Sequence, residues 1–154
     1  NGVAVGPNGD YVLVTETGRY QVTRYWLNGP QSGTTDVFID NLPGFPDNIS
    51  YDDDGRFWLA LYAPRDPVLD LTLPQPWLRK VLFRLPQWMH PEPKPYAAIV
   101  ALDTEGRVVA NAQASGPDVF APVTSVKRRG DALFLGSLSY PGVARLPVSA
   151  VTAD

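Results

Sequence analysis

Three residues in this sequence, Asn1, Asp47 and Asn48, have side chains that could together hold a metal ion. Asn1 opens one short apolar run, and Asp47 with Asn48 opens another, directly after the turn prolines Pro43 and Pro46. Oxygen ligands from Asp and Asn, with no His or Cys among them, suit calcium and not zinc or copper. The carboxylate of Asp47 could also position or deprotonate a water molecule. A purely structural role stays open, because Asn-Gly and Asp-Asn pairs are common in turns.

The segments that must position these residues form an internal repeat of strand, Gly-containing turn and hydrophobic strand. The repeat begins at Asn1, again at Asp47 and, in a weaker copy, near Val123. A repeat of about 40 to 50 residues is what one four-stranded blade of a β-propeller occupies. The innermost strands of all blades begin at the same mouth of a propeller. We therefore expect Asn1 and Asp47 to converge on the central axis.

The sequence predicts an all-β fold of three propeller blades at about residues 1–46, 47–118 and 119–154. In the first blade, strands are expected at 3–5, 11–16, 21–27 and 35–39. In the second blade, one strand is expected to begin at 47, and the others are expected at 57–62, 97–103 and 108–113. In the third blade, strands are expected at 123–126, 132–138 and 142–148. Three blades are fewer than the about four to eight that close a ring. We expect a missing propeller half, or a second copy of the chain, to complete it.

A proline-rich insertion at about 63–95 interrupts the second blade. Pro76 can occupy the first turn of a helix that Pro86 ends. This helix has Leu78, Val81, Leu82 and Leu85 on one side and Arg79, Lys80 and Arg84 on the other. The segment from Trp77 to Leu85 could form a lid over the propeller mouth or touch a membrane surface. It could equally be a packed excursion that covers one end of the barrel.

Composition excludes several classes of function. The net charge of −3 provides no basic field for nucleic acid. The chain has no cysteine, which rules out disulfides, zinc-thiolate sites and thiol nucleophiles. The 16 prolines and 13 glycines suit short strands joined by turns and argue against a helical bundle. The single histidine, His90, lies among prolines in the insertion, where we expect an ordinary surface residue.

Four stretches carry a resemblance to a known family: ETGRYQVTRYWLNGPQSG at 16–33, LPGFPDNISYDDDGRFWLA at 42–60, PWLRK at 76–80 and LFLGSLSYPGVARL at 133–146. Over nearly its whole length the chain resembles the strictosidine synthase-like family, which includes the adipocyte plasma membrane-associated proteins and is related to paraoxonase and gluconolactonase or regucalcin propellers. The resemblance implies a six-bladed propeller with calcium on its axis, of which this chain would be about the three C-terminal blades. The calcium ligands of the family and its relatives match Asn1 and Asp47, and those of the paraoxonases also match Asn48.

The resemblance implies a calcium-dependent hydrolase of a lactone or aryl ester, with Asp47 as both metal ligand and catalytic residue. A non-catalytic propeller with structural calcium, which binds a ligand or protein, is the alternative. A third possibility is condensation of an amine with an aldehyde, as in plant strictosidine synthase. Thr124 disfavours it, because Thr124 stands where that enzyme has a glutamate base. The paraoxonase histidine pair has no match either, since His90 lies in the insertion.

Overall fold

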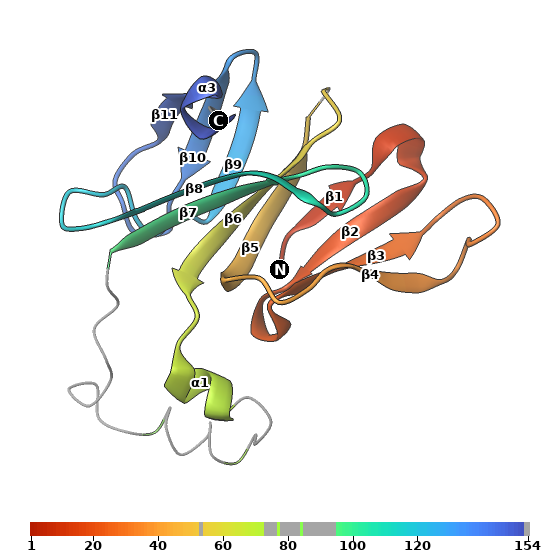
Figure 1. Ribbon diagram of the computed structural model, residues 1–154, viewed down its shortest axis with the longest axis horizontal. Coiled ribbons are helices and arrows are strands. Elements are labelled where there is room, and N and C mark those ends of the chain that lie inside the picture. Colours follow the sequence, from red (N-terminus) through yellow and green to blue (C-terminus); the bar gives the residue numbers. More distant parts are fainter. Residues whose placement is uncertain (53, 73–76, 78–83, 85–94, 153–154) are drawn as a thin grey trace.

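The computed structural model describes residues 1–52, 54–72, 77, 84 and 95–152, and it shows three antiparallel β-sheets (Figure 1). The first sheet contains β1 (Val3–Val5), β2 (Tyr11–Glu16), β3 (Gln21–Trp26) and β4 (Thr35–Ile39), in that order. The second contains β5 (Gly44–Tyr51), β6 (Phe57–Pro64), β7 (Tyr96–Leu102) and β8 (Val108–Ser115). The third has the order β11 (Ala144–Pro147), β10 (Ala132–Gly136) and β9 (Ser125–Arg129). The predicted all-β architecture is confirmed, whereas the number of blades in the complete protein stays a prediction.

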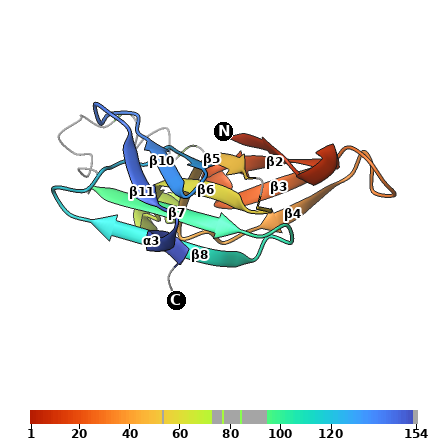
Figure 2. The same cartoon turned by 90° about the horizontal axis from the view of Figure 1, so that it is seen from above.

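Short helical segments join or end these strands. They are the 3-10 turns η1 (Pro7–Gly9) and η2 (Thr17–Arg19) and the helices α1 (Pro67–Thr72) and α3 (Ser149–Thr152). Seen from above, the N-terminus and the C-terminus lie on opposite sides of the molecule (Figure 2). None of the helices in the described part of the chain has the length and apolar character to span a membrane.

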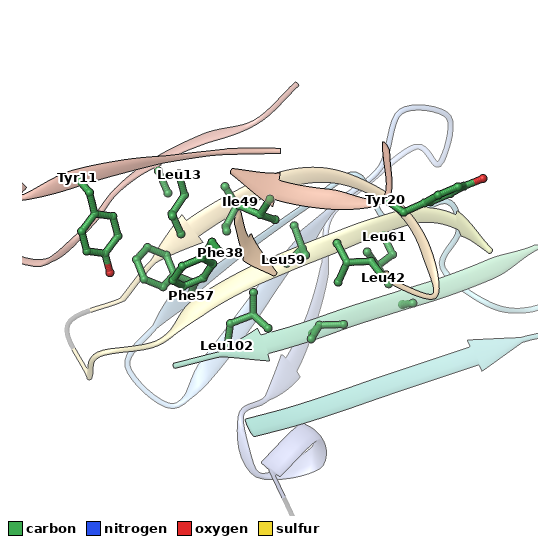
Figure 3. Packing of buried hydrophobic residues seen from close by; sticks show 14 residues of the cluster. Tyr11, Leu13, Tyr20, Phe38, Leu42, Ile49, Phe57, Leu59, Leu61 and Leu102 are labelled. Carbon is green, nitrogen blue, oxygen red and sulfur yellow. The ribbon is translucent and has the colours of Figure 1, made fainter. Parts of the chain in front are cut away.

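The second sheet is apolar on both faces because it lies between the other two. Side chains of β6 alternate across it: Phe57 and Leu59 pack against the first sheet, and Trp58 packs against the third. Figure 3 shows the first of these cores, where Tyr11, Leu13 and Phe38 of the first sheet meet Ile49, Phe57 and Leu59 of the second. The alternation explains why a continuous apolar run in the sequence forms a buried strand.

Two hairpins of the second sheet turn through the same side-chain motif. Asp52 Oδ1 accepts hydrogen bonds from the backbone N–H groups of Asp54 and Arg56, at 3.0 and 2.9 Å. Asp103 Oδ1 accepts the equivalent bonds from Glu105 and Arg107, at 3.0 and 2.9 Å. Aspartate favours turns because its side chain can bond to the backbone two residues on. Each turn contains a glycine with positive φ, Gly55 or Gly106, which fits the predicted repeat of strand, Gly-containing turn and strand.

The insertion begins with a helix that the sequence did not predict. Helix α1 starts with Pro67, a residue whose fixed φ suits the first turn, but its six residues are too few for hydrophobic periodicity to reveal it. Arg65, directly after β6, connects the C-terminal end of this strand to the first sheet. Its guanidinium lies 4.2 Å from the centre of the Tyr20 ring and donates to Asn41 Oδ1 at 2.6 Å. The helix expected at 76–85 lies outside the described residues apart from Trp77, which is exposed, and Arg84. His90 also lies outside them.

One face of the first sheet is apolar and exposed. Its residues include Val3, Val5, Tyr25 and Val37. They lie on the face opposite the side chains that contact the second sheet, and apolar residues on both faces are typical of a strand that is covered on both sides. The missing propeller half, or the second copy of the chain, that we expect from the sequence would cover this face. The presence of such a partner stays a prediction.

Candidate metal-binding and catalytic site

The first strands of the three sheets, β1, β5 and β9, come together around Asp47 and Asn48. The Thr15 hydroxyl, from the strand beside β1, donates to the backbone carbonyl of Asp47 at 2.6 Å. On the other side, the backbone N–H of Asn48 donates to the carbonyl of Thr124 at 3.1 Å. Further along β5, the Ser50 hydroxyl donates to the carbonyl of Val126 at 2.7 Å. These bonds join β5 to both neighbouring sheets.

Gly2 allows the backbones of β1 and β5 to lie in close contact beside Asp47 and Asn48. A Cβ atom at this position would lie 2.6 Å from the Cα of Asn48 and 2.7 Å from the carbonyl oxygen of Asp47. Only glycine fits such a contact between two backbones. The backbone N–H of Gly2 instead donates to Thr15 Oγ1 at 2.6 Å, so one hydroxyl links both strands. The Asn-Gly pair thus has a packing role beyond that of a turn.

The structure brings the three residues singled out in the sequence to one place. The side chain of Asp47 is buried, with an exposed fraction of 9%, and those of Asn1 and Asn48 are exposed. Asn48 Nδ2 donates to Asp47 Oδ1 at 3.2 Å and to the carbonyl of Thr124 at 2.9 Å. Asn1 Nδ2 donates to Thr17 Oγ1 at 3.3 Å. One carboxylate and two carboxamides therefore lie at the meeting point of the inner strands.

The charge of Asp47 is poorly compensated. Burial raises the pKa of Asp47, and hydrogen bonding from the Asn1 side chain only partly opposes this. Within the described part of the chain, Asp47 forms no ion pair with a lysine or arginine. A buried carboxylate with neutral partners would gain much from a nearby cation. The donor set therefore fits a hard divalent ion such as calcium.

These residues supply only part of a calcium coordination shell. Calcium takes about six to eight oxygen ligands. Among the described residues, no group of three or more His, Cys, Asp or Glu side chains could hold a metal ion. A calcium ion here would need carboxamide oxygens beside the single carboxylate, and further oxygens from water or from other parts of the complete protein.

Thr124 lies beside Asn48 and has no basic group to offer. Its hydroxyl donates to the carbonyl of Gly136 at 3.3 Å, and its own carbonyl accepts both bonds from Asn48. A hydroxyl in this role does not remove a proton from a substrate. The chemistry available at this point is coordination and hydrogen bonding, with Asp47 as the one carboxylate.

Sequence reasoning missed Thr15 and Thr17, which hold this arrangement together. Thr17 Oγ1 donates to the carbonyl of Pro46 at 2.7 Å and accepts from Asn1. A signal for Thr15 is present in hindsight, because it continues the buried alternation of Tyr11 and Leu13 along β2 with a polar side chain. A polar residue at a core position indicates a specific hydrogen-bonding partner.

Comparison with known proteins identifies the family. No family model matches the chain. The chain is 35% identical over 147 residues to Protein STRICTOSIDINE SYNTHASE-LIKE 10 of Arabidopsis thaliana, covering 92% of this chain and 39% of that protein. It is 33% identical over 153 residues to the adipocyte plasma membrane-associated protein of Bos taurus, covering 95% of this chain and 37% of that protein. The chain belongs to the strictosidine synthase-like family. This strictosidine synthase-like chain spans less than two fifths of the length of these relatives.

A solved structure supports the fold of this family member. Luciferin-regenerating enzyme matches with a TM-score of 0.53 and 18% sequence identity, over 88% of this chain and 36% of that protein. Similarity at this level of identity concerns the fold alone. The three sheets are thus part of the strictosidine synthase-like β-propeller fold, as the resemblance implied.

Proposed function

We propose that the protein containing this chain is a calcium-dependent hydrolase of a lactone or aryl ester, and that Asn1, Asp47 and Asn48 are calcium ligands. The observation that supports it is the Asp47 carboxylate, which is buried beside two carboxamides and has a raised pKa. Membership of a propeller family with enzymes among its structural neighbours is consistent with the proposal.

Calcium bound at this site would polarise the carbonyl of the substrate and stabilise negative charge on its oxygen. Asp47 would hold and orient the attacking water through its carboxylate. Asn48 fixes that carboxylate, because its Nδ2 bridges Asp47 Oδ1 and the carbonyl of Thr124. A raised pKa makes Asp47 a stronger base than an exposed aspartate, whereas a bound cation lowers the pKa of a ligating carboxylate. Positioning of water is the role of Asp47 that is compatible with both effects.

A specific observation favours a second function, a non-catalytic propeller with structural calcium that binds a ligand or protein. Thr15, Thr17 and Asn48 already join neighbouring strands around Asp47 through hydrogen bonds. A cation at this junction would strengthen the same connections and raise the stability of the ring without any reaction. Both functions predict calcium binding, and only the first predicts turnover.

The full-length protein tests both functions through calcium titration calorimetry and assays on phenyl acetate and γ-butyrolactone. We expect Asp47→Asn to lose calcium binding and to reduce hydrolysis by about a hundredfold, the usual effect of removing one key polar group from an active site. Asp131→Asn is the matched control, because its side chain is 94% exposed and lies far from β5 in the sequence. It should leave both properties unchanged.

The outcomes separate the alternatives. Calcium-dependent thermal stabilisation without turnover on either substrate would favour the non-catalytic function. Hydrolysis that continues after chelation, or that Asp47→Asn leaves intact, would defeat the metal-hydrolase proposal. Loss of binding and of activity in Asp131→Asn as well would show that the effect does not come from the Asp47 site.

A further inference from the structure

A cavity of about 290 Å³ lies between the second and third sheets. It is formed where β6 ends, where β7 begins, before the start of β9 and after the end of β10. The residues that matter for its chemistry are Tyr62, Pro95, Tyr96, Pro122, Leu138 and Ser139, which we call the aromatic pocket. None of them belongs to the calcium-ligand set proposed above.

The aromatic pocket begins close to the Asp47 site. Pro122 precedes Thr124 by two residues, and the carbonyl of Thr124 accepts two hydrogen bonds from Asn48. Leu138 follows Gly136 by two residues, and the carbonyl of Gly136 accepts the backbone N–H of Thr124 at 2.9 Å. Two residues of extended chain span at most about 7 Å. The aromatic pocket and the Asp47 site therefore lie at the same end of the second and third sheets.

The lining of the pocket suits a flat, uncharged group. It combines two tyrosine rings, two proline rings and a leucine, and the described residues that line it include no charged side chain. Tyr96 is held in place because its hydroxyl donates to Gln113 Oε1 at 2.9 Å, and burial raises the pKa of Tyr96, so the phenol stays neutral. Aromatic rings pack favourably against other rings in offset or edge-to-face geometry.

The pocket also exposes apolar surface to solvent in the part of the chain that the structure describes. Leu138 is 80% exposed and Tyr62 is 39% exposed. Ligand pockets are mostly apolar, with volumes of about 300 to 1,000 Å³, so this cavity is at the small end of that range. It has room for one ring system with a short substituent, and not for a long acyl chain.

We infer that the aromatic pocket binds the aromatic ring of an uncharged aryl ester or aryl-substituted lactone whose carbonyl lies at Asp47. This inference rests on the proposed function for the position of the carbonyl, and it adds the part of the substrate that determines specificity. Binding of the ring itself depends only on the pocket, so it is measurable without turnover.

The first experiment measures the affinity of the full-length protein for phenol by ligand-detected NMR, with cyclohexanol as the non-aromatic probe. We expect phenol to bind more tightly than cyclohexanol, and Tyr62→Ala and Leu138→Ala each to weaken phenol binding by about fivefold, the cost of one aromatic or apolar contact. Tyr25→Ala is the matched control, because Tyr25 and Tyr62 are both 39% exposed. Truncation of Leu138 opens no core, since this side chain is largely in solvent.

The second experiment compares KM values for phenyl acetate and for γ-butyrolactone, which lacks a ring. Tyr62→Ala and Leu138→Ala should raise KM for phenyl acetate by about fivefold and leave KM for γ-butyrolactone within about twofold, because only the aryl substrate uses the pocket. Tyr25→Ala should change neither value.

The results distinguish the inference from the proposed reaction. If wild-type protein does not bind phenol, or if Tyr62→Ala and Leu138→Ala bind it normally, the pocket assignment is wrong whether or not esters are hydrolysed. If phenol binding depends on both residues but no ester is hydrolysed, the pocket assignment is supported and the proposed reaction is contradicted.

Discussion

Two aspartates are buried in or beside β5, Asp47 within the strand and Asp52 directly after it, and burial affects their pKa values differently. The exposed fractions of Asp47 and Asp52 are 9% and 7%. Burial raises the pKa of Asp47, with little to oppose it. Burial acts on Asp52 in the same direction, but hydrogen bonds from Trp58, the Arg56 backbone, Arg128 and the Asp54 backbone outweigh it and hold the pKa of Asp52 below its usual value.

The difference between the two pKa values comes from the donors that surround each carboxylate. Asp52 Oδ2 accepts from Trp58 Nε1 at 2.7 Å and from Arg128 at 3.2 Å. Asp47 Oδ1 accepts from the neutral Asn48 side chain at 3.2 Å. A carboxylate whose bonding capacity is filled is a structural anchor between sheets. A carboxylate with only neutral partners has capacity left for a cation, so burial alone does not identify a functional aspartate.

The largest effect on stability is expected at Asp52, whose carboxylate accepts the most hydrogen bonds. Asp52→Asn places an amide donor against Trp58 Nε1 and Arg128, and it should lower the free energy of unfolding by about 3 kcal/mol, as the loss of one partner from a buried pair does. Denaturant unfolding of the full-length protein would measure it. Asp103→Asn changes the same turn motif at a site where the side-chain partner, Arg107, is exposed. This substitution should lower the free energy of unfolding by clearly less. Equal losses of unfolding free energy in Asp52→Asn and Asp103→Asn would contradict the special role of the buried partners of Asp52.

The next effect tests how closely β1 must approach β5 beside Asp47. Gly2→Ala would place a Cβ against the backbone of β5 and should lower the free energy of unfolding by about 2 kcal/mol, as overpacking of a close contact does. The same shift should weaken calcium binding, because Asn1 is adjacent. Gly18→Ala is the control, since a Cβ there meets nothing within 4 Å. A Gly2→Ala protein with unchanged stability and calcium affinity would refute the close packing.

A smaller effect is expected when Asp47 itself is neutralised without calcium. Asp47→Asn removes a buried charge that lacks a basic partner, so metal-free stability at neutral pH should stay within about 1 kcal/mol of the wild type or rise. The same substitution should abolish any increase in Tm on adding calcium. Differential scanning calorimetry with and without calcium would measure both. A large metal-free loss would mean that Asp47 is a structural anchor like Asp52.

The contributions of Asp47 and Asp52 to the pH dependence of stability should have opposite signs. The pKa of Asp52 is lowered, so its contribution is present above the pKa in the unfolded chain and is lost as pH falls through the folded value. The pKa of Asp47 is raised, so its contribution is present at low pH and is lost as pH rises through the folded value. Urea unfolding of calcium-free protein between about pH 3 and 7, with each Asp→Asn variant, would separate the two slopes. Slopes of the same sign would overturn the comparison.

Much of the fold was predictable because its signals are local. Apolar runs, with Asp and Gly at the turns between them, placed strands such as β2 and β6, and Gly55 and Gly106 adopt the positive φ values of 81° and 84° that such turns use. Helix α1 was missed because six residues carry too little pattern. The segment at 76–85 lies outside the described residues, so its predicted helix stays a prediction.

The candidate site was predictable only in part. Equivalent repeat positions predicted that Asn1 and Asp47 would converge, and the structure brings them together with Asn48. The repeat did not indicate that Thr15 and Thr17 hold these strands, or that Tyr62 and Leu138 line a common pocket. Such contacts join positions that share no repeat equivalence, so no spacing in the chain reveals them.

The sequence by itself determined an all-β chain of repeated hairpins, its family, and a carboxylate-carboxamide set with the chemistry of a hard-metal ligand. Only the tertiary structure decided which aspartate can use that chemistry. Arg128, which is 76 positions from Asp52, fills one carboxylate, while Asp47 has no such partner among the described residues. The physical reason is that the pKa of a buried acid depends on the donors around it in space, and the order of residues along a chain does not state which donors those are.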